Sequence, residues 1–223
     1  MSQPPKSTTR EPLTRDRVAE TAVQVMDAEG YGAVTMRRIG RELGVEAMSL
    51  YNHVADKDDL VTAMIDAVFG DFALPPGDVG DWEQQIRLLA RSYRAALLAH
   101  PDVIQLLAEN TQPSTRMESL LPLDTALATL RSIGLSDQEV VTAYRMFGGF
   151  IIGYVMMETR GIMSLGDDID VDAVTAVIPD ELPNLKQLVP EICAPGTEAD
   201  FDFGIEVMIR GLRGRVPEGR DVG

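Results

Sequence analysis

Apolar residues recur every three or four positions along most of the chain, the spacing that places side chains on one face of an α-helix. Near the N-terminus four residues follow it: Val18, Ala22, Val25 and Met26. Thr14 is suited to cap the start of such a helix, and Gly30 is suited to end it. The pattern predicts a first helix over residues 14–29.

Two short helices are predicted next. The second helix follows Thr35 and ends at Gly44, whose φ freedom suits a sharp turn. A third helix over about 46–52 and a fourth that begins at Asp56 come after it. Two short helices joined at a glycine behind a longer helix form the helix-turn-helix pattern, whose second helix enters the major groove of DNA. Four apolar residues of this segment are expected in the core: Ile39, Leu43, Val45 and Leu50.

The remainder of the chain shows the same spacing in longer segments. Five further helices are predicted, over residues 81–99, 102–109, 114–133, 137–160 and 198–213. The fourth of these begins with a capping box, because Ser136 and Glu139 can each satisfy an unpaired amide there. Residues 161–183 are rich in glycine and aspartate and hold two prolines, which predicts a loop. No strand is predicted, so the fold class is all-α.

Prolines and glycines divide the chain into parts. Residues 1–12 predict a flexible arm, because they hold prolines and show no periodicity. A second irregular stretch, residues 73–80, marks a domain boundary. The predicted parts are the arm, a three-helix helix-turn-helix domain, a connecting helix with its linker, a larger helical domain, and a tail: residues 1–12, 13–60, 61–80, 81–216 and 217–223.

The composition, 45% hydrophobic and 25% charged, is that of a folded, water-soluble protein. No stretch approaches the roughly 18 apolar residues of a membrane span, and the N-terminus lacks the apolar centre of a secretory signal. We therefore expect a cytoplasmic protein with no membrane partner. Cys193, His53 and His100 do not form a zinc cluster, so neither a metal nor a cofactor is expected.

The net charge of −15 argues at first against a DNA partner, because DNA-binding surfaces are basic. The acidity, however, lies mostly in the second part of the chain. Residues 1–60 hold 8 basic and 10 acidic side chains, whereas residues 61–223 hold 12 and 25. Residues 35–57 have a local balance of +1. A small basic face that meets phosphate is therefore compatible with the acidic total.

The helix-turn-helix segment also has a specific residue pattern. It reads Thr-Met-Arg-Arg-Ile-Gly-Arg-Glu-Leu-Gly-Val over residues 35–45 and Leu-Tyr-Asn-His-Val-Ala-Asp-Lys over residues 50–57. This pattern resembles the signature of the TetR family of bacterial repressors, and the resemblance covers roughly residues 13–213. It implies a ligand-responsive repressor of the bacterial cytoplasm, associated with the nucleoid, whose domain over residues 81–216 binds the ligand and forms the dimer.

The resemblance assigns DNA contact to nine residues: Thr35, Arg37, Ala47, Met48, Ser49, Tyr51, Asn52, His53 and Lys57. Their chemistry agrees, because arginine binds guanine through two hydrogen bonds, hydroxyls bond phosphate oxygens, and lysine supplies charge. A core position is the alternative for Tyr51, and a cap of the third helix is the alternative for His53. Ala47, Met48 and Asn52 differ from the family's tetracycline-responsive members, so the resemblance does not imply the operator sequence.

Two predicted helices are apolar on more than one side. The helix over 137–160 has Ile152 outside its main apolar stripe, and the helix over 198–213 has Phe203 outside its own. The resemblance implies that these helices from two subunits form a four-helix bundle, and burial within one domain is the alternative. A two-fold dimer places the recognition helices roughly 34–36 Å apart, so the operator is expected to be a pseudo-palindrome.

A mostly apolar ligand pocket is expected in the second domain. Its predicted residues are Phe72, Leu89, Tyr93, Leu107, Tyr144, Phe147, Met156 and Met157. For each of these residues a place in the core is an equally good interpretation. Family members that bind a magnesium chelate hold it with a histidine and a glutamate, whose positions fall here on Leu107 and Met157. Neither side chain chelates Mg²⁺, so no metal is expected in this pocket.

Three other functions remain to be weighed. An enzyme is disfavoured, because the sequence has no phosphate-binding loop, metal cluster or nucleophile with a plausible histidine partner. A helical protein-interaction module without DNA binding would explain the acidic total. A transcriptional activator of the same family is the third possibility, because the position of the operator decides between activation and repression.

Overall fold

The protein is described by a computed structural model that covers residues 12–70, 72, 74, 81–110, 112, 114–160, 170–194 and 196–215. Every regular element in this part of the chain is a helix. The α-helices are α1 Arg15–Glu29, α2 Met36–Leu43, α3 Ala47–Leu50, α4 Lys57–Gly70, α5 Trp82–Ala99, α6 Val103–Glu109, α7 Met117–Ser132, α8 Asp137–Arg160, α9 Val171–Val177, α10 Pro183–Cys193 and α11 Glu198–Arg213. A short 3₁₀ turn, Tyr31–Ala33, follows α1. The all-α fold predicted from the sequence is confirmed.

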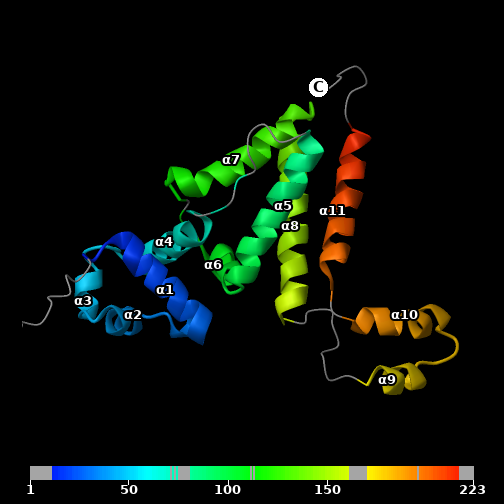
Figure 1. The fold of residues 1–223 in the computed structure, drawn as a ribbon, viewed down its shortest axis with the longest axis horizontal. Coiled ribbons are helices and arrows are strands. Elements are labelled where there is room, and N and C mark those ends of the chain that lie inside the picture. The colour runs from blue at the N-terminus through cyan, green and yellow to red at the C-terminus, as the bar shows by residue number, and fades with distance from the viewer. Residues whose placement is uncertain are drawn as a thin grey trace, which may run out of the picture.

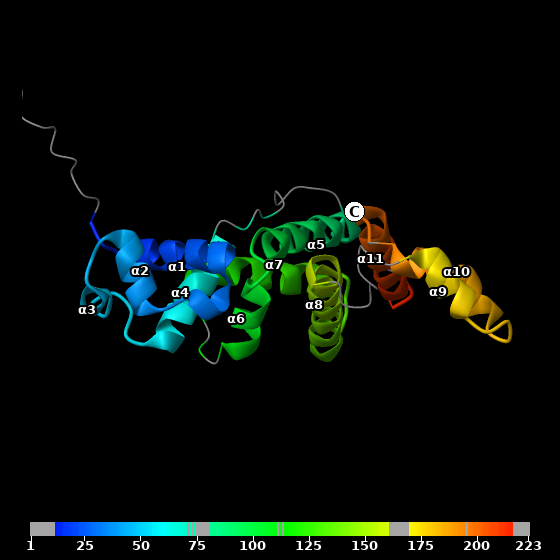
Figure 2. The same cartoon turned by 90° about the horizontal axis from the view of Figure 1, so that it is seen from below.

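The helices are arranged along an elongated molecule (Figures 1 and 2). The first three, which we call the head (α1 to α3), lie at one end, and α4 packs along α1. In the middle, α5, α8 and α11 lie side by side and contact one another, and α7 packs across α5 and α8. At the other end α9 and α10 pack on each other and project from the body (Figure 1).

Capping interactions explain why several helix ends match the prediction. The Thr14 hydroxyl accepts a hydrogen bond from the Arg17 amide at 3.2 Å, as expected for the residue before α1. At the start of α8 the Ser136 amide donates to the Glu139 carboxylate at 3.0 Å, and the Glu139 amide donates to the Ser136 hydroxyl at 3.4 Å. The predicted capping box is therefore present, and α8 covers the predicted residues.

The predicted loop over residues 161–183 is wrong in part. Residues 161–169 lie outside the described part of the chain, but Val171–Val177 form α9, and Pro183 is the first residue of α10. Asp170 caps α9, because its carboxylate accepts a hydrogen bond from the Ala173 amide at 3.0 Å. Proline is favoured at the first position of a helix, where its missing N–H leaves no hydrogen bond unmade. The aspartate and the proline that suggested a loop therefore mark helix starts.

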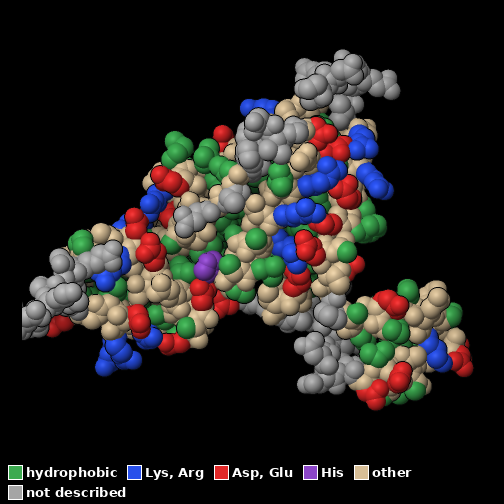
Figure 3. Space-filling view, viewed as in Figure 1, with side chains coloured by type: hydrophobic (Ala, Val, Ile, Leu, Met, Phe, Trp, Pro, Cys, Tyr) green, Lys and Arg blue, Asp and Glu red, His purple; other side chains and the backbone are tan. Residues whose placement is uncertain are grey.

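Ion pairs fix α11 against α5 in an antiparallel arrangement. Arg91 binds Asp202 at 2.7 Å, and one turn earlier on α5 Arg87 binds Glu206. Arg213, near the end of α11, binds Glu83 at the start of α5 at 2.6 Å. Basic and acidic side chains accordingly alternate over these two helices on the face shown in Figure 3. One side of α11 therefore faces α5 along its length.

Another side of α11 enters the core through Phe201, which is completely buried. Its ring lies 5.7 Å from that of Phe150 and 5.4 Å from that of Tyr154, both on α8. The Arg94 guanidinium lies 5.1 Å from the Phe201 ring centroid. Gly204 leaves the space that the Phe150 ring fills, because a Cβ atom there would overlap the ring. This aromatic cluster joins α8 and α11 closely.

Candidate functional site

The turn between α2 and α3 depends on two glycines. Gly44 has a φ of 64°, in the left-handed region, and its amide ends α2 by donating to the Arg41 carbonyl at 3.3 Å. Gly40 lies where the chain returns after this turn, and its carbonyl accepts from the Val45 amide at 2.8 Å. A Cβ atom on Gly40 would lie 2.9 Å from the Val45 carbonyl oxygen. The close approach of α2 and α3 therefore requires a residue without a side chain.

Replacing Gly40 by alanine is expected to push α3 away from α2. We expect a loss of about 1–3 kcal/mol in the free energy of unfolding, because the obstructing atoms belong to the backbone. Gly32→Ala is the control, since nothing lies within 4 Å of a Cβ atom at that position. Urea unfolding followed by circular dichroism measures both. Equal stability of the two variants would contradict the close packing of the helix-turn-helix.

The structure leaves most of the nine predicted DNA-contact residues accessible. Six are exposed: Thr35, Arg37, Met48, Tyr51, Asn52 and Lys57. Three are half-buried: Ala47, Ser49 and His53. None is buried, whereas Ile39 and Leu50 from the same segment are completely buried and Leu43 and Val45 pack partly buried against the core. The segment thus has one face toward the core and one face toward solvent, as DNA reading requires.

The two neighbouring arginines of α2 have different surroundings. Arg38 binds Glu29 at 2.6 Å and Glu42 at 2.7 Å, and the hydrogen bond from Arg38 lowers the pKa of the Glu29 carboxyl. Arg37 is exposed and has no ion pair with any residue that the structure describes. Arg38 therefore has a structural role in the head, whereas Arg37 is available to bind a phosphate or a base edge.

Other predicted DNA-contact residues have local structural roles as well. The Thr35 hydroxyl accepts a hydrogen bond from the Arg38 amide at 3.1 Å and so caps α2. The Lys57 ammonium lies 5.3 Å from the centroid of the Tyr31 ring. The Tyr51 side chain, at the end of α3, is 46% exposed. A core position, the alternative weighed for Tyr51, is therefore excluded, and the side chain is accessible to a phosphate.

The α5–α6 corner is fastened to the head. The His100 imidazole, at the end of α5, forms a hydrogen bond with the Asp27 carboxylate of α1 at 2.8 Å. The Asp102 carboxylate accepts a hydrogen bond from the Tyr31 amide at 3.0 Å. The sequence suggested that His100 ends α5, and it does, but its side chain also joins the two parts of the molecule. These two hydrogen bonds join the α5–α6 corner directly to the end of α1 and to the turn that follows it.

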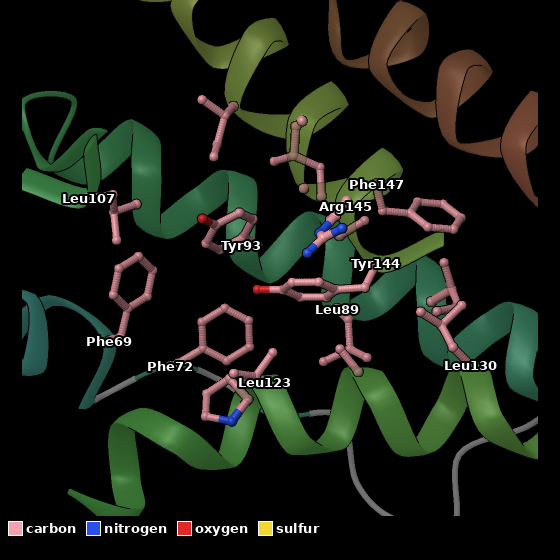
Figure 4. Close-up of a pocket in the computed structure, with 18 of the residues that line it drawn as sticks. Phe69, Phe72, Leu89, Tyr93, Leu107, Leu123, Leu130, Tyr144, Arg145 and Phe147 are labelled. Carbon is pink, nitrogen blue, oxygen red and sulfur yellow. The ribbon is translucent and has the colours of Figure 1, made fainter. Parts of the chain in front are cut away.

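A cavity of about 450 Å³ lies between α4, α5, α6, α7 and α8 (Figure 4). Apolar and aromatic side chains form most of its wall: Ile65, Phe69, Phe72, Ile86, Leu89, Ala90, Tyr93, Leu107, Pro122, Leu123, Ala126, Leu130, Tyr144, Phe147, Ile151 and Ile152. Gly148 and Gly149 of α8 widen it, and Ser119 and Arg145 add polar atoms. A cavity of this size and lining suits a mostly apolar small molecule.

Six of the eight predicted ligand-pocket residues line this cavity: Phe72, Leu89, Tyr93, Leu107, Tyr144 and Phe147. Met156 and Met157 do not line it, and instead pack partly buried against the core. The reason is the extent of the cavity along α8, because its wall ends at Ile151 and Ile152, whereas the two methionines lie about one turn further toward the end of the helix. Met156 and Met157 are therefore the two predicted residues that the structure does not place in the cavity wall.

Sequence reasoning missed the part of the cavity wall that α7 supplies, which includes Ser119. It also missed Arg145 of α8. The sequence did contain one indication that Arg145 has a special role, because it is the only charged residue between Val140 and Met157. Leu107 lies in the cavity wall, and its side chain offers no ligand for Mg²⁺. In the described part of the chain, no group of three histidine, cysteine or acidic side chains is arranged to hold a metal ion.

Two family models match the chain. The model of bacterial regulatory proteins of the tetR family matches residues 18–64, which include α2, α3 and the turn between them. The model of the tetracyclin repressor-like C-terminal domain matches residues 74–216, which include most of the cavity. The matched segments thus correspond to the two regions in which the site residues lie.

Curated relatives resemble the chain over different lengths. The HTH-type transcriptional repressor DrrR1 of Streptomyces coeruleorubidus is 36% identical over 154 residues, which are 68% of this chain and 54% of that protein. The class A tetracycline repressor protein of transposon 1721 from Escherichia coli is 27% identical over 206 residues, which are 91% of this chain and 92% of that protein. The chain therefore spans about half the length of the first relative and nearly all of the second.

Solved structures resemble the fold over most of its length. The protein ActR of Streptomyces coelicolor in complex with actinorhodin has a TM-score of 0.78 and 28% identity, covering 93% of this chain and 100% of that one. Its complex with (S)-DNPA has a TM-score of 0.77 and 27% identity, covering 92% of this chain and 99% of that one. These likenesses include both the helix-turn-helix and the domain that contains the cavity.

Proposed function

Because the chain belongs to the TetR family of bacterial regulatory proteins, we propose that it is a dimeric repressor that binds an operator and leaves it when a small molecule enters the cavity. The observation that carries the proposal is the position of α4. One part of α4 packs along α1 of the head, and Ile65 and Phe69 of the same helix line the cavity. Occupation of the cavity is thereby coupled to the orientation of the recognition helix.

DNA contact is proposed for the exposed face of the helix-turn-helix. Arg37 supplies a guanidinium that no described residue pairs with, Lys57 supplies a second charge, and Tyr51 supplies a phosphate-bonding hydroxyl. Met48, 72% exposed, presents an apolar side chain to the groove, where it suits the methyl group of thymine. The local positive balance of the segment allows binding to a phosphate backbone in spite of the acidic total.

The proposed dimer face lies on α8 and α11. On α11, Phe203, Val207 and Gly211 are exposed and spaced four residues apart, on a side that neither the core nor α5 occupies. On α8, Met146 and Gly153 are exposed. By length and composition alone, α8 is apolar enough to cross a membrane, yet only 33% of its most apolar 18-residue segment is buried within this chain. A second copy of the chain would cover these surfaces in a four-helix bundle.

Release from the operator is proposed to follow from the ligand's differential affinity for two orientations of the head. A ligand that contacts Phe69 and Leu107 displaces α4 and α6, and the α5–α6 corner is held to the head by Asp27 and Asp102. By linkage, the ligand weakens DNA binding only by the difference in its affinity for the two states, typically about 1–3 kcal/mol. The complexes of ActR with actinorhodin and with (S)-DNPA support a ligand-binding role for this domain.

Selection from a random duplex library at fixed salt tests DNA binding. We expect enrichment of a pseudo-palindrome, and the logarithm of the binding constant should fall linearly with the logarithm of the salt concentration. Arg37→Ala and Tyr51→Ala are each expected to weaken the best site by about 1–3 kcal/mol. Arg131→Ala, an exposed arginine at the end of α7, is the control and is expected to leave affinity unchanged.

An absence of enrichment would contradict the proposal and favour a helical protein-interaction module that does not bind DNA. If a site is enriched but both variants bind it as tightly as the wild type, the DNA-binding surface must lie on another face of the protein. A reporter gene placed beside the selected operator distinguishes a repressor from an activator. We further propose that the protein is a regulator rather than an enzyme, in agreement with the names of its relatives, and that it acts in the cytoplasm.

A further inference from the structure

The polar side chains that line the cavity can all donate a hydrogen bond. They are the hydroxyls of Tyr93, Ser119 and Tyr144 and the guanidinium of Arg145, and no acidic side chain is among the described lining residues. This is unusual for the chain, in which acidic residues outnumber basic ones by 35 to 20. The cavity therefore offers hydrogen-bond donors and one positive charge to whatever occupies it.

The hydroxyls are held in the protonated form. Burial raises the pKa of Tyr93, with a further contribution from the neighbouring Tyr144, and burial also raises the pKa of Tyr144. Both phenols are therefore neutral donors at every physiological pH. The Ser119 hydroxyl is enclosed and has no hydrogen-bond partner in the described part of the chain, although an enclosed hydroxyl without a partner is costly. A hydrogen-bond acceptor on a bound ligand would supply the missing partner of this hydroxyl.

Arg145 differs from the arginines on the facing helix. Arg87, Arg91 and Arg94 of α5 are each paired with a carboxylate. Arg145 lines the cavity beside Tyr144 (Figure 4), is exposed, and has no hydrogen bond or ion pair with any described residue. An unpaired guanidinium beside an apolar cavity matches a planar anionic group, which arginine binds through two parallel hydrogen bonds.

We propose that the cavity binds a ring-containing, mostly apolar compound with an anionic group, and that Arg145 is the residue that binds this group. The aromatic rings of Phe69, Phe72 and Phe147 enclose the apolar part of the compound, and the cavity hydroxyls donate hydrogen bonds to its remaining oxygen atoms. The inference rests on the proposed ligand-binding function and narrows it to a class of ligand. A carboxylate, a sulfonate and an ionised phenol share the chemistry that Arg145 recognises.

Fluorescence titration of the full chain without DNA tests this inference with two probes. Anilinonaphthalene sulfonate and N-phenylnaphthylamine share one ring system, and only the first has an anionic group. Arg145→Gln is expected to weaken binding of the sulfonate about ten- to a hundredfold and to leave binding of the neutral probe within about twofold. Arg131→Gln, which removes the same charge from an exposed site outside the cavity, is the matched control and is expected to change neither.

Ala126→Trp locates the probes, because it fills the cavity from α7 and is expected to exclude both. If Arg145→Gln weakened binding of both probes equally, or of neither, the inference that the ligand is anionic would be overturned, while the ligand-binding function would stand. Binding of neither probe to the wild type would contradict both. Dissociation of the dimer by Arg145→Gln in sedimentation would instead assign the arginine to a carboxylate of the partner subunit, and would also overturn the inference.

Discussion

Phe203→Asp is expected to convert the protein to a monomer and to lower its operator affinity about 10²–10⁴-fold. Phe203 is 70% exposed on the side of α11 that faces neither α5 nor the core. An aspartate there would have to be buried without a partner in the proposed four-helix bundle, which costs several kcal/mol. A monomer holds only one recognition helix, so the gain from binding two half-sites together is lost. Sedimentation equilibrium and operator titration measure the two effects.

Met117→Asp is the matched control for this dimer test. Met117 is also 70% exposed, but it lies at the start of α7, outside the proposed bundle. The same new charge is expected to leave the protein dimeric and bound to DNA. A Phe203→Asp protein that stays dimeric, or equal dissociation of both variants, would show that α8 and α11 do not form the interface.

Leu50→Ala is expected to destabilise the head by about 2–5 kcal/mol, because the leucine is completely buried and its removal leaves a cavity. The head is small, so a loss of this size is a large fraction of its stability. Operator binding should disappear as the head unfolds. Urea unfolding, followed by circular dichroism, gives the free energy of unfolding.

The control for this core substitution comes from the same short helix. Met48→Ala changes a side chain that is 72% exposed, and it is expected to alter stability by less than about 0.5 kcal/mol. A similar loss in both variants would mean that α3 does not turn Leu50 inward. An unchanged Leu50→Ala protein would contradict the core of the helix-turn-helix.

The sequence predicted helices most successfully where capping residues and apolar spacing agree. The Ser136 and Glu139 side chains fix the start of α8, and Thr197 forms a second capping box at the start of α11. Between these helices the same reasoning failed. Asp170 and Pro183 were interpreted as loop residues, although a cap and a first-turn proline are the residues that begin α9 and α10. Composition could not distinguish the two roles.

The cavity was predictable in part for a related reason. The apolar stripe of α8 indicated Tyr144 and Phe147, which do line it. Periodicity gives the face of a helix but not how far along the helix a cavity extends, so it could not exclude Met156 and Met157. The wall from α7 depends on how that helix crosses α5 and α8, which is a property of tertiary packing. Arg145 was the charged exception in an apolar run, and such exceptions indicate function more directly than the run itself.

Footprinting of the wild-type protein on the selected duplex tests the central claim most directly. The account predicts two protected half-sites on one face of the DNA, related by a dyad and centred roughly 34–36 Å apart, with the pattern lost in Phe203→Asp. A single protected half-site, a footprint without a dyad, or uniform protection along the duplex would contradict a dimeric operator-binding protein.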